Sequence, residues 1–146
     1  MPPPSVEVSN MKIYFAGSIR GGRDDTEKYF ALINHLKQYG QVLSEHIGLA
    51  TLDSSGEKKS SEEVYQRDVE WIREADVVVV EVSTPSLGVG YELRLAEELN
   101  KKILCLFEEK EGKLLSFMVG GNKNIKVKHY KTLKEATDSI DEFLKQ

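Results

Sequence analysis

The sequence predicts an α/β fold: a doubly wound, five-stranded parallel sheet in three layers, of the Rossmann or flavodoxin-like kind. Short apolar runs, of which Val77–Val80 is the purest, alternate along the chain with amphipathic segments of helical period. Runs rich in β-branched residues are typical of strands buried on both faces of a parallel sheet. Repeated strand–helix units favour right-handed crossovers, which place helices on both faces.

The expected elements follow one another without an internal repeat. Strands are expected at residues 12–16, 41–43, 76–82, 102–107 and 125–128, and helices at residues 24–39, 60–75, 89–99 and 132–144. Gly40 is the expected left-handed stop of the first helix. Ser60 and Glu63 offer a capping box for the second. Residues 44–59 form a loop long enough to be a functional flap, and residues 108–124 surround a short apolar piece at 114–119.

Length and composition limit what the chain can be. Its 146 residues suit one domain, which we place at residues 11–146, after a flexible tail at residues 1–10. A net charge of −4 gives no general attraction to nucleic acid. Cys105 is the only cysteine and lies in a buried strand pattern, so we expect an inert thiol in a reducing compartment, the cytoplasm or the nucleus. No apolar stretch is long enough to cross a bilayer, and residues 1–10 lack the features of a secretory signal.

The end of the strand at 76–82 is the most informative place in the chain. Thr84, Pro85 and Ser86 break the apolar run, and two glycines then open a helical pattern. Open α/β sheets bind ligands outside the carboxyl ends of their strands. Glu92 is expected in the first turn of the following helix, where the macrodipole favours an ionised carboxylate. This arrangement suggests a nucleophile or a base beside a phosphate or a sugar.

The loop after the first strand is a candidate anion site. It consists of Gly17, Ser18, Ile19, Arg20, Gly21, Gly22 and Arg23. Glycines allow the backbone to approach a ligand, N–H groups at a helix start hold anions, and an arginine adds a bidentate contact to phosphate. The spacing matches neither a dinucleotide fingerprint nor a Walker A loop. A plain turn with two solvated arginines is the competing interpretation.

Asp68 interrupts the apolar side of the helix at 60–75. A carboxylate on a buried face is unfavourable unless it is paired or used, so it is either a rim residue bonded to the backbone or a functional group. Its helix packs beside the strand that leads to Glu92, and two carboxylates in different settings are the usual equipment for glycosidic cleavage. Tyr14 is either a core tyrosine or a hydrogen-bond donor to such a carboxylate.

The remaining candidates carry less information. Ser86 and Ser116 are loop hydroxyls, and His46 stands alone at the mouth of the sheet. No second histidine or cysteine has metal-ligand spacing, so no metal is expected. Nothing indicates an organic cofactor.

Five blocks of the chain, at residues 14–23, 44–46, 68–79, 85–92 and 103–107, carry a resemblance to a known family. In this order they resemble the nucleoside 2-deoxyribosyltransferase superfamily, and within it the members that hydrolyse 2'-deoxynucleoside 5'-monophosphates. The resemblance extends from about residue 12 to about residue 120. It implies cleavage of an N-glycosidic bond to give a free base and 2-deoxyribose 5-phosphate, with 5-hydroxymethyl-dUMP or dGMP as substrates.

The resemblance also implies a role for each candidate residue. Glu92 matches the nucleophile that attacks C1', Asp68 the acid and base, and Tyr14 the residue that orients the nucleophile. His46 matches a histidine near the base and sugar, and Ser116 a serine that reaches the phosphate across a homodimer interface. The implied nucleotide and phosphate site consists of Gly17, Ser18, Ile19, Arg20, Gly21, Gly22, Arg23, Ser86 and Gly88.

Two other functions stay open at this point. A deoxyribosyltransferase would pass the sugar to another base instead of water, and a nucleotide-binding module would bind a monophosphate without turnover. Phe117 stands where the resembling sequences have a small residue, and residues 47–59 and the segment after Gly121 diverge from them. These departures leave the preferred base and the regulation open.

Overall fold

A computed structural model describes the protein at residues 10–19, 25–48 and 58–145. These residues form one five-stranded sheet, all parallel, in the order β2-β1-β3-β4-β5. This confirms the predicted doubly wound α/β fold, with the flavodoxin-like strand order. Nearly all of the expected N-terminal tail (residues 1–9) and most of the expected flap (residues 49–57) lie outside the described residues.

The elements alternate as the sequence predicts. The strands are β1 Lys12–Ala16, β2 Gln41–Val42, β3 Val77–Glu81, β4 Lys102–Glu108 and β5 Lys126–Tyr130. The helices are α2 Thr26–Leu36, η1 Glu45–Gly48 (a 3-10 turn), α3 Ser61–Glu74, α4 Leu87–Glu98, α5 Phe117–Gly120 and α6 Leu133–Leu144. The short helix α5 overlaps the end of the apolar piece expected at 114–119.

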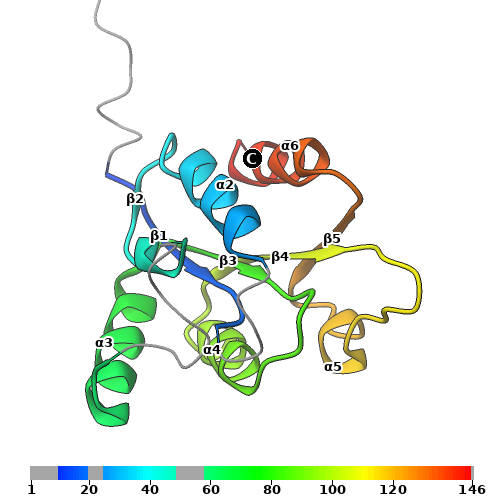
Figure 1. Cartoon of the computed structure of the whole chain (residues 1–146). Coiled ribbons are helices and arrows are strands. Elements are labelled where there is room, and N and C mark those ends of the chain that lie inside the picture. The colour runs from blue at the N-terminus through cyan, green and yellow to red at the C-terminus, as the bar shows by residue number, and fades with distance from the viewer. Residues whose placement is uncertain (1–9, 20–24, 49–57, 146) are drawn as a thin grey trace, which may run out of the picture.

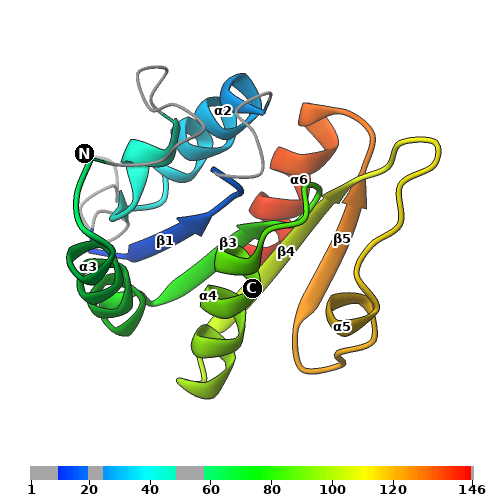
Figure 2. The same ribbon diagram turned by 60° about the horizontal axis from the view of Figure 1, so that its bottom comes forward.

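Helices cover both faces of the sheet and make three layers (Figure 1, Figure 2). α2 and α6 lie on one face, and α3 and α4 lie on the other. Alternate side chains of a strand point to opposite faces, so Ile13 and Phe15 enter the core beneath α2 and α6. Tyr14 and Ala16 enter the core beneath α3 and α4. The sequence of β1 therefore decides that the Tyr14 hydroxyl lies on the α3 and α4 side.

Two local predictions are confirmed. The Ser60 hydroxyl accepts from the Glu63 N–H at 3.1 Å, and the Glu63 carboxylate accepts from the Ser60 N–H at 3.0 Å, which is the capping box at the start of α3. Cys105 is fully buried in β4, and burial raises the pKa of its thiol to about 12. The thiol is therefore an unreactive core group.

The prediction that Gly40 is a left-handed helix stop is wrong. α2 ends at Leu36, and the described glycine with a positive φ is Gly112. A Cβ added at Gly40 would lie 2.2 Å from the carbonyl oxygen of Met11. Gly40 is therefore required because the chain before β1 passes close to its backbone.

No helix in residues 10–19, 25–48 and 58–145 combines the length and the apolar character needed to cross a membrane.

Candidate active site

The carboxyl ends of β1 and β3 lie next to each other, where the strand order reverses. Ligands of open α/β sheets bind at such a switch point. Gly17 and Ser18 follow β1, and the chain after β3 runs to Ser86, the N-cap of α4. The Ser86 hydroxyl accepts from the Val89 N–H at 3.2 Å. Two of the predicted site segments therefore meet at this edge.

Tyr14 and Glu92 are joined directly. The Tyr14 hydroxyl donates a hydrogen bond to Oε2 of Glu92, across from β1 to α4. Burial raises the pKa of Tyr14 far above its ordinary value, and the charges of Glu92 and Asp68 raise it further. The phenol therefore stays protonated and serves as a fixed donor to the carboxylate.

The expectation of a dipole-lowered pKa at Glu92 is wrong. Ser86 caps the helix and α4 begins at Leu87, earlier than the sequence predicts, so Glu92 lies in the second turn, where the macrodipole is weak. Burial raises the pKa of Glu92 to about 7, and the charge of Asp68 adds to this, against the hydrogen bond from Tyr14 and the charge of Arg67. The carboxyl group therefore changes its charge near neutral pH.

Asp68 is paired by its neighbour in sequence. Arg67 donates to Oδ1 of Asp68 from Nε at 3.0 Å and from Nη2 at 2.8 Å. Nη2 of Arg67 also lies 3.4 Å from Nε2 of His46, which follows β2 in η1. The Arg67 guanidinium carbon lies 4.6 Å from the centroid of the Trp71 ring. His46, Arg67 and Asp68 therefore form a connected cluster at one side of the site.

The two carboxylates share a cavity. A cleft of about 410 Å³ between α3 and α4 is lined by Asp68 and Glu92 among mostly apolar neighbours, with Tyr65 and Tyr91 in edge contact at 6.2 Å between ring centroids. Such a cleft, apolar with a few convergent polar groups, suits a small ligand. Tyr14, Asp68, Glu92 and His46, which the sequence analysis singled out separately, are thus brought together.

The first loop is described only in part. A Cβ added at Gly17 would lie 2.7 Å from Cζ of Tyr29, so a side chain at this position would displace that ring. Ser18 is fully buried, and Ile19 packs against the core beneath α2. The other predicted residues of this loop lie outside the described residues: Arg20, Gly21, Gly22 and Arg23.

Ser86 and Ser116 line a second groove, of about 410 Å³, beside the start of α4. Ser116 caps the short helix α5, and its hydroxyl accepts from the Met118 N–H at 3.2 Å. Gly88 lies in the first turn of α4, where an added Cβ would lie 3.8 Å from Oγ of Ser86. The structure thus places Ser86, Gly88 and Ser116 around the start of α4, and Gly88 also lines the cleft that holds Asp68 and Glu92.

Comparison with known proteins decides the family. The sequence model of nucleoside 2-deoxyribosyltransferase matches residues 13–131. The chain belongs to the nucleoside 2-deoxyribosyltransferase family. It is 49% identical over 116 residues to the 5-hydroxymethyl-dUMP N-hydrolase of Tetraodon nigroviridis, covering 78% of this chain and 82% of that one. It is 51% identical over 112 residues to the enzyme of the same name from Danio rerio, covering 76% and 78%.

A solved structure of this fold is also similar. The structure of the Clostridium botulinum CMP N-glycosidase BcmB superposes with a TM-score of 0.67, at 21% identity, covering 90% of this chain and 98% of that one. At this identity the likeness supports the family's α/β fold.

Arg67 is the residue of the candidate site that sequence reasoning missed. Its signal was present as an arginine and a tryptophan at i and i+4 on one helix, a spacing that brings the two side chains together. The contact with His46 leaves no such local trace, because the two residues are joined only by the fold.

Among the described residues, no group of three or more histidine, cysteine, aspartate or glutamate side chains is placed to hold a metal ion.

Proposed function

We propose that this member of the family hydrolyses the N-glycosidic bond of 2'-deoxynucleoside 5'-monophosphates, such as 5-hydroxymethyl-dUMP or dGMP. The products are the free base and 2-deoxyribose 5-phosphate. The relatives at about half identity are N-hydrolases, and by that relationship the protein is an N-glycosidase. The observation that carries the proposal is the cleft lined by Asp68 and Glu92, with the Tyr14 hydroxyl bonded to Glu92 from β1.

In the first proposed step, an ionised oxygen of Glu92 attacks C1' of the sugar. The bond from C1' to the base nitrogen breaks, its electron pair stays on the base, and Asp68 gives a proton to the base. Tyr14 holds the attacking carboxylate through its hydroxyl. A covalent glycosyl-enzyme intermediate on Glu92 results.

In the second proposed step, Asp68 removes a proton from a water molecule whose oxygen attacks C1'. The bond between C1' and Glu92 breaks, and Glu92 leaves as a carboxylate. Because Glu92 must be ionised to attack and its pKa is about 7, kcat/KM rises as the pH rises through about 7.

The start of α4 supports a phosphate site. Its first turn presents backbone N–H groups, and the positive end of the helix dipole favours an anion there. Ser86 and Gly88 lie at this position, and Ser18 and Ile19 follow the neighbouring strand. Binding of the phosphate away from C1' would orient the sugar, so a nucleoside without phosphate should lose kcat as well as affinity.

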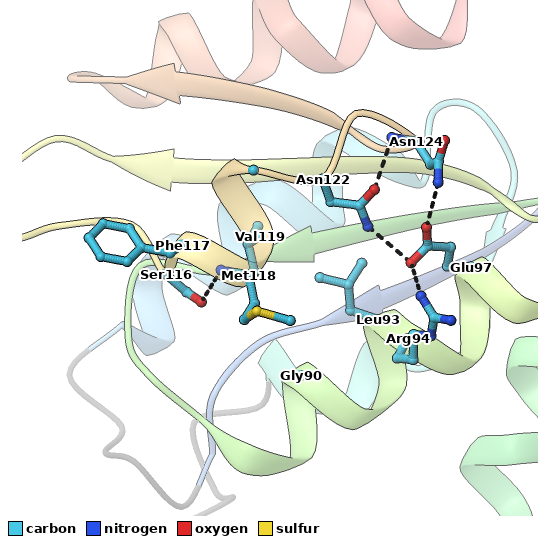
Figure 3. A pocket seen from close by; sticks show the side chains of 11 residues that line it. Gly90, Leu93, Arg94, Glu97, Ser116, Phe117, Met118, Val119, Asn122 and Asn124 are labelled. Atoms are coloured by element: carbon cyan, nitrogen blue, oxygen red, sulfur yellow. Dashed lines mark hydrogen bonds and ion pairs between the residues drawn. The ribbon is translucent and has the colours of Figure 1, made fainter.

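We further propose a homodimer in which Ser116 completes the partner's phosphate site. The groove between α4 and α5, of about 580 Å³, is lined by Leu93, Ser116 and Val119 among others (Figure 3). Phe117 and Met118 of α5 also line it and are 86% and 85% exposed. Contiguous exposed apolar side chains of this kind favour association with another protein surface.

Release of free base tests the proposal. Purified protein is incubated with 5-hydroxymethyl-dUMP or dGMP, and the products are separated by liquid chromatography. We expect release by the wild type and a loss of at least about a hundredfold in the Glu92→Gln variant, which keeps the shape of the side chain. Glu98→Gln, an exposed change on the same helix, serves as the matched control.

The same assay separates the alternatives. With a second base added, a new deoxynucleotide would indicate a transferase, because the sugar would then pass to the base. Binding of both monophosphates with no release of base would contradict the hydrolase and support a binding module.

A further inference from the structure

Arg67 contacts two side chains of the candidate site, Asp68 and His46. It donates to Oδ1 of Asp68 through Nε at 3.0 Å and Nη2 at 2.8 Å. Nη2 also lies 3.4 Å from Nε2 of His46. A guanidinium group has donors only, so this contact requires the imidazole nitrogen to accept.

The planar face of the Arg67 guanidinium group also packs against an aromatic ring, that of Trp71. Its central carbon lies 4.6 Å from the centroid of the Trp71 ring, and the rings of Trp71 and His46 are 5.7 Å apart. The Arg67 side chain is 20% exposed. A planar cation stacked on one ring and bonded at its edge has little freedom, which makes it a rigid support for the carboxylate.

The charges around Glu92 give this support a second effect. The groups that bear on Glu92 are Tyr14 from β1 and both Asp68 and Arg67 from α3, with His46 of η1 next to Arg67. Asp68 raises the pKa of Glu92, and Arg67 lowers it. Two carboxylates that share a cleft would otherwise oppose each other's ionisation.

We propose that Arg67 is a positioning residue, which fixes the Asp68 carboxylate at the cleft and offsets its repulsion of Glu92. This inference rests on the proposed function, because it assigns Arg67 to the pair of carboxylates that would cleave the glycosidic bond. Arg67 acts through Asp68 and Glu92 and takes no bond to the substrate. The two N–H donors of the guanidinium group, and not its charge alone, hold the Asp68 carboxylate in place.

Two substitutions separate the two effects. Arg67→Gln removes the charge and the fork, while Arg67→Lys keeps a charge and loses the fork. Arg73→Gln is the matched control, since it removes one positive charge from an exposed position on the same helix. For each variant, kcat and KM for 5-hydroxymethyl-dUMP are measured from pH 5 to pH 9.

We expect Arg67→Gln to lower kcat by about tenfold to a hundredfold with little change in KM, because a misplaced acid slows the chemical step. Its acid limb of kcat/KM should move to higher pH, since a positive charge that favours ionised Glu92 is gone. Arg67→Lys should lower kcat but leave the acid limb close to that of the wild type. Arg73→Gln should leave kcat and the acid limb unchanged.

An unchanged kcat in Arg67→Lys would overturn the positioning role, and so would a change confined to KM, which would make Arg67 a substrate contact. An unmoved acid limb in Arg67→Gln would overturn the electrostatic part. If Arg67→Gln does not fold, Arg67→Lys still decides through kcat. Failure of the proposed function is distinguishable, because then the wild type itself releases no base.

Discussion

The Glu92 carboxyl lies between α4 and β1, and burial is the main cause that raises its pKa from 4.5 to about 7. In the unfolded chain the group has its ordinary pKa. Between pH 4.5 and 7 the folded protein therefore binds more protons than the unfolded chain, and the free energy of unfolding falls as the pH rises through this window. A charged carboxylate at this place favours the chemistry and opposes folding.

We predict that Glu92→Gln stabilises the protein at pH 8 by about 1–3 kcal/mol and changes its stability little at pH 4. Glutamine keeps an oxygen that can accept from Tyr14 and carries no charge. Urea unfolding of the wild type and the variant at both pH values measures the difference. Glu98→Gln, at an exposed ion pair with Arg94 on the same helix, should show less than about 1 kcal/mol at either pH. A difference between the variant and the wild type that is the same at pH 4 and at pH 8 would contradict the raised pKa.

A cluster of charged residues around Lys28 connects α2 to the sheet. The Lys28 ammonium lies 3.4 Å from Glu81, 3.1 Å from Glu108 and 3.4 Å from Asp25, and its side chain is only 11% exposed. Glu81 is fully buried and also accepts from the hydroxyl of Tyr130. Asp25 accepts from the Thr84 hydroxyl at 2.9 Å, which ties the chain before α2 to the loop between β3 and α4. The two loops of the candidate site are thus joined through this cluster.

We predict that Lys28→Met lowers the free energy of unfolding by about 3–5 kcal/mol, because it leaves the buried carboxylate of Glu81 without its cation. Methionine keeps most of the apolar side chain of lysine, so the loss of stability measures the effect of removing the charge. Lys37→Met is the control, since Lys37 pairs with Glu45 at 3.0 Å on the surface, where such a pair contributes at most about 1 kcal/mol. Equal losses in the two variants, measured by urea unfolding, would show that the cluster does not stabilise the fold.

The elements themselves could be predicted closely, and their ends less well. The apolar run of β3 and the capping box of α3 are local signals, so both elements were expected where they lie. The sequence predicted that α4 begins at Val89, because Gly88 and Gly90 are poor helix formers and interrupt the apolar pattern. In the structure Ser86 is the N-cap and the helix begins at Leu87. This error placed Glu92 in the wrong turn and gave the wrong direction for its pKa.

At the scale of the whole molecule, the sheet and its layers follow from the alternation of strand and helix, whereas contacts between distant segments do not. Asp68 was expected near Glu92 because its helix packs beside the strand that leads to Glu92. For Tyr14 the sequence allowed two interpretations, a core tyrosine or a donor to such a carboxylate, and the structure has the donor. The contact of Arg67 with His46 and the cluster around Lys28 join segments that no periodicity relates. Residues contributed by a partner subunit are harder still to predict, because the structure of one chain shows the exposed surface but not the chain that would cover it.

That surface leads to a test of the proposed homodimer. If Ser116 serves the partner's site, a dimer of one Ser116→Ala chain and one Glu92→Gln chain contains one intact site. In that site the Ser116→Ala chain supplies Glu92, and the Glu92→Gln chain supplies Ser116. Each variant alone has no intact site. Random pairing on co-expression makes half of the dimers mixed, so we expect about a quarter of wild-type activity, well above either variant alone.

The result distinguishes a shared site from one made within a single chain. If Ser116 served the site of its own chain, the mixed dimer would hold one site without the serine and one without the nucleophile, and activity would not recover. Two tags, one on each chain, isolate the mixed dimer for the assay. Sedimentation of the wild type as a monomer at micromolar concentration would contradict the interface itself. Recovery of activity would therefore place Ser116 of one chain against the phosphate held by the other.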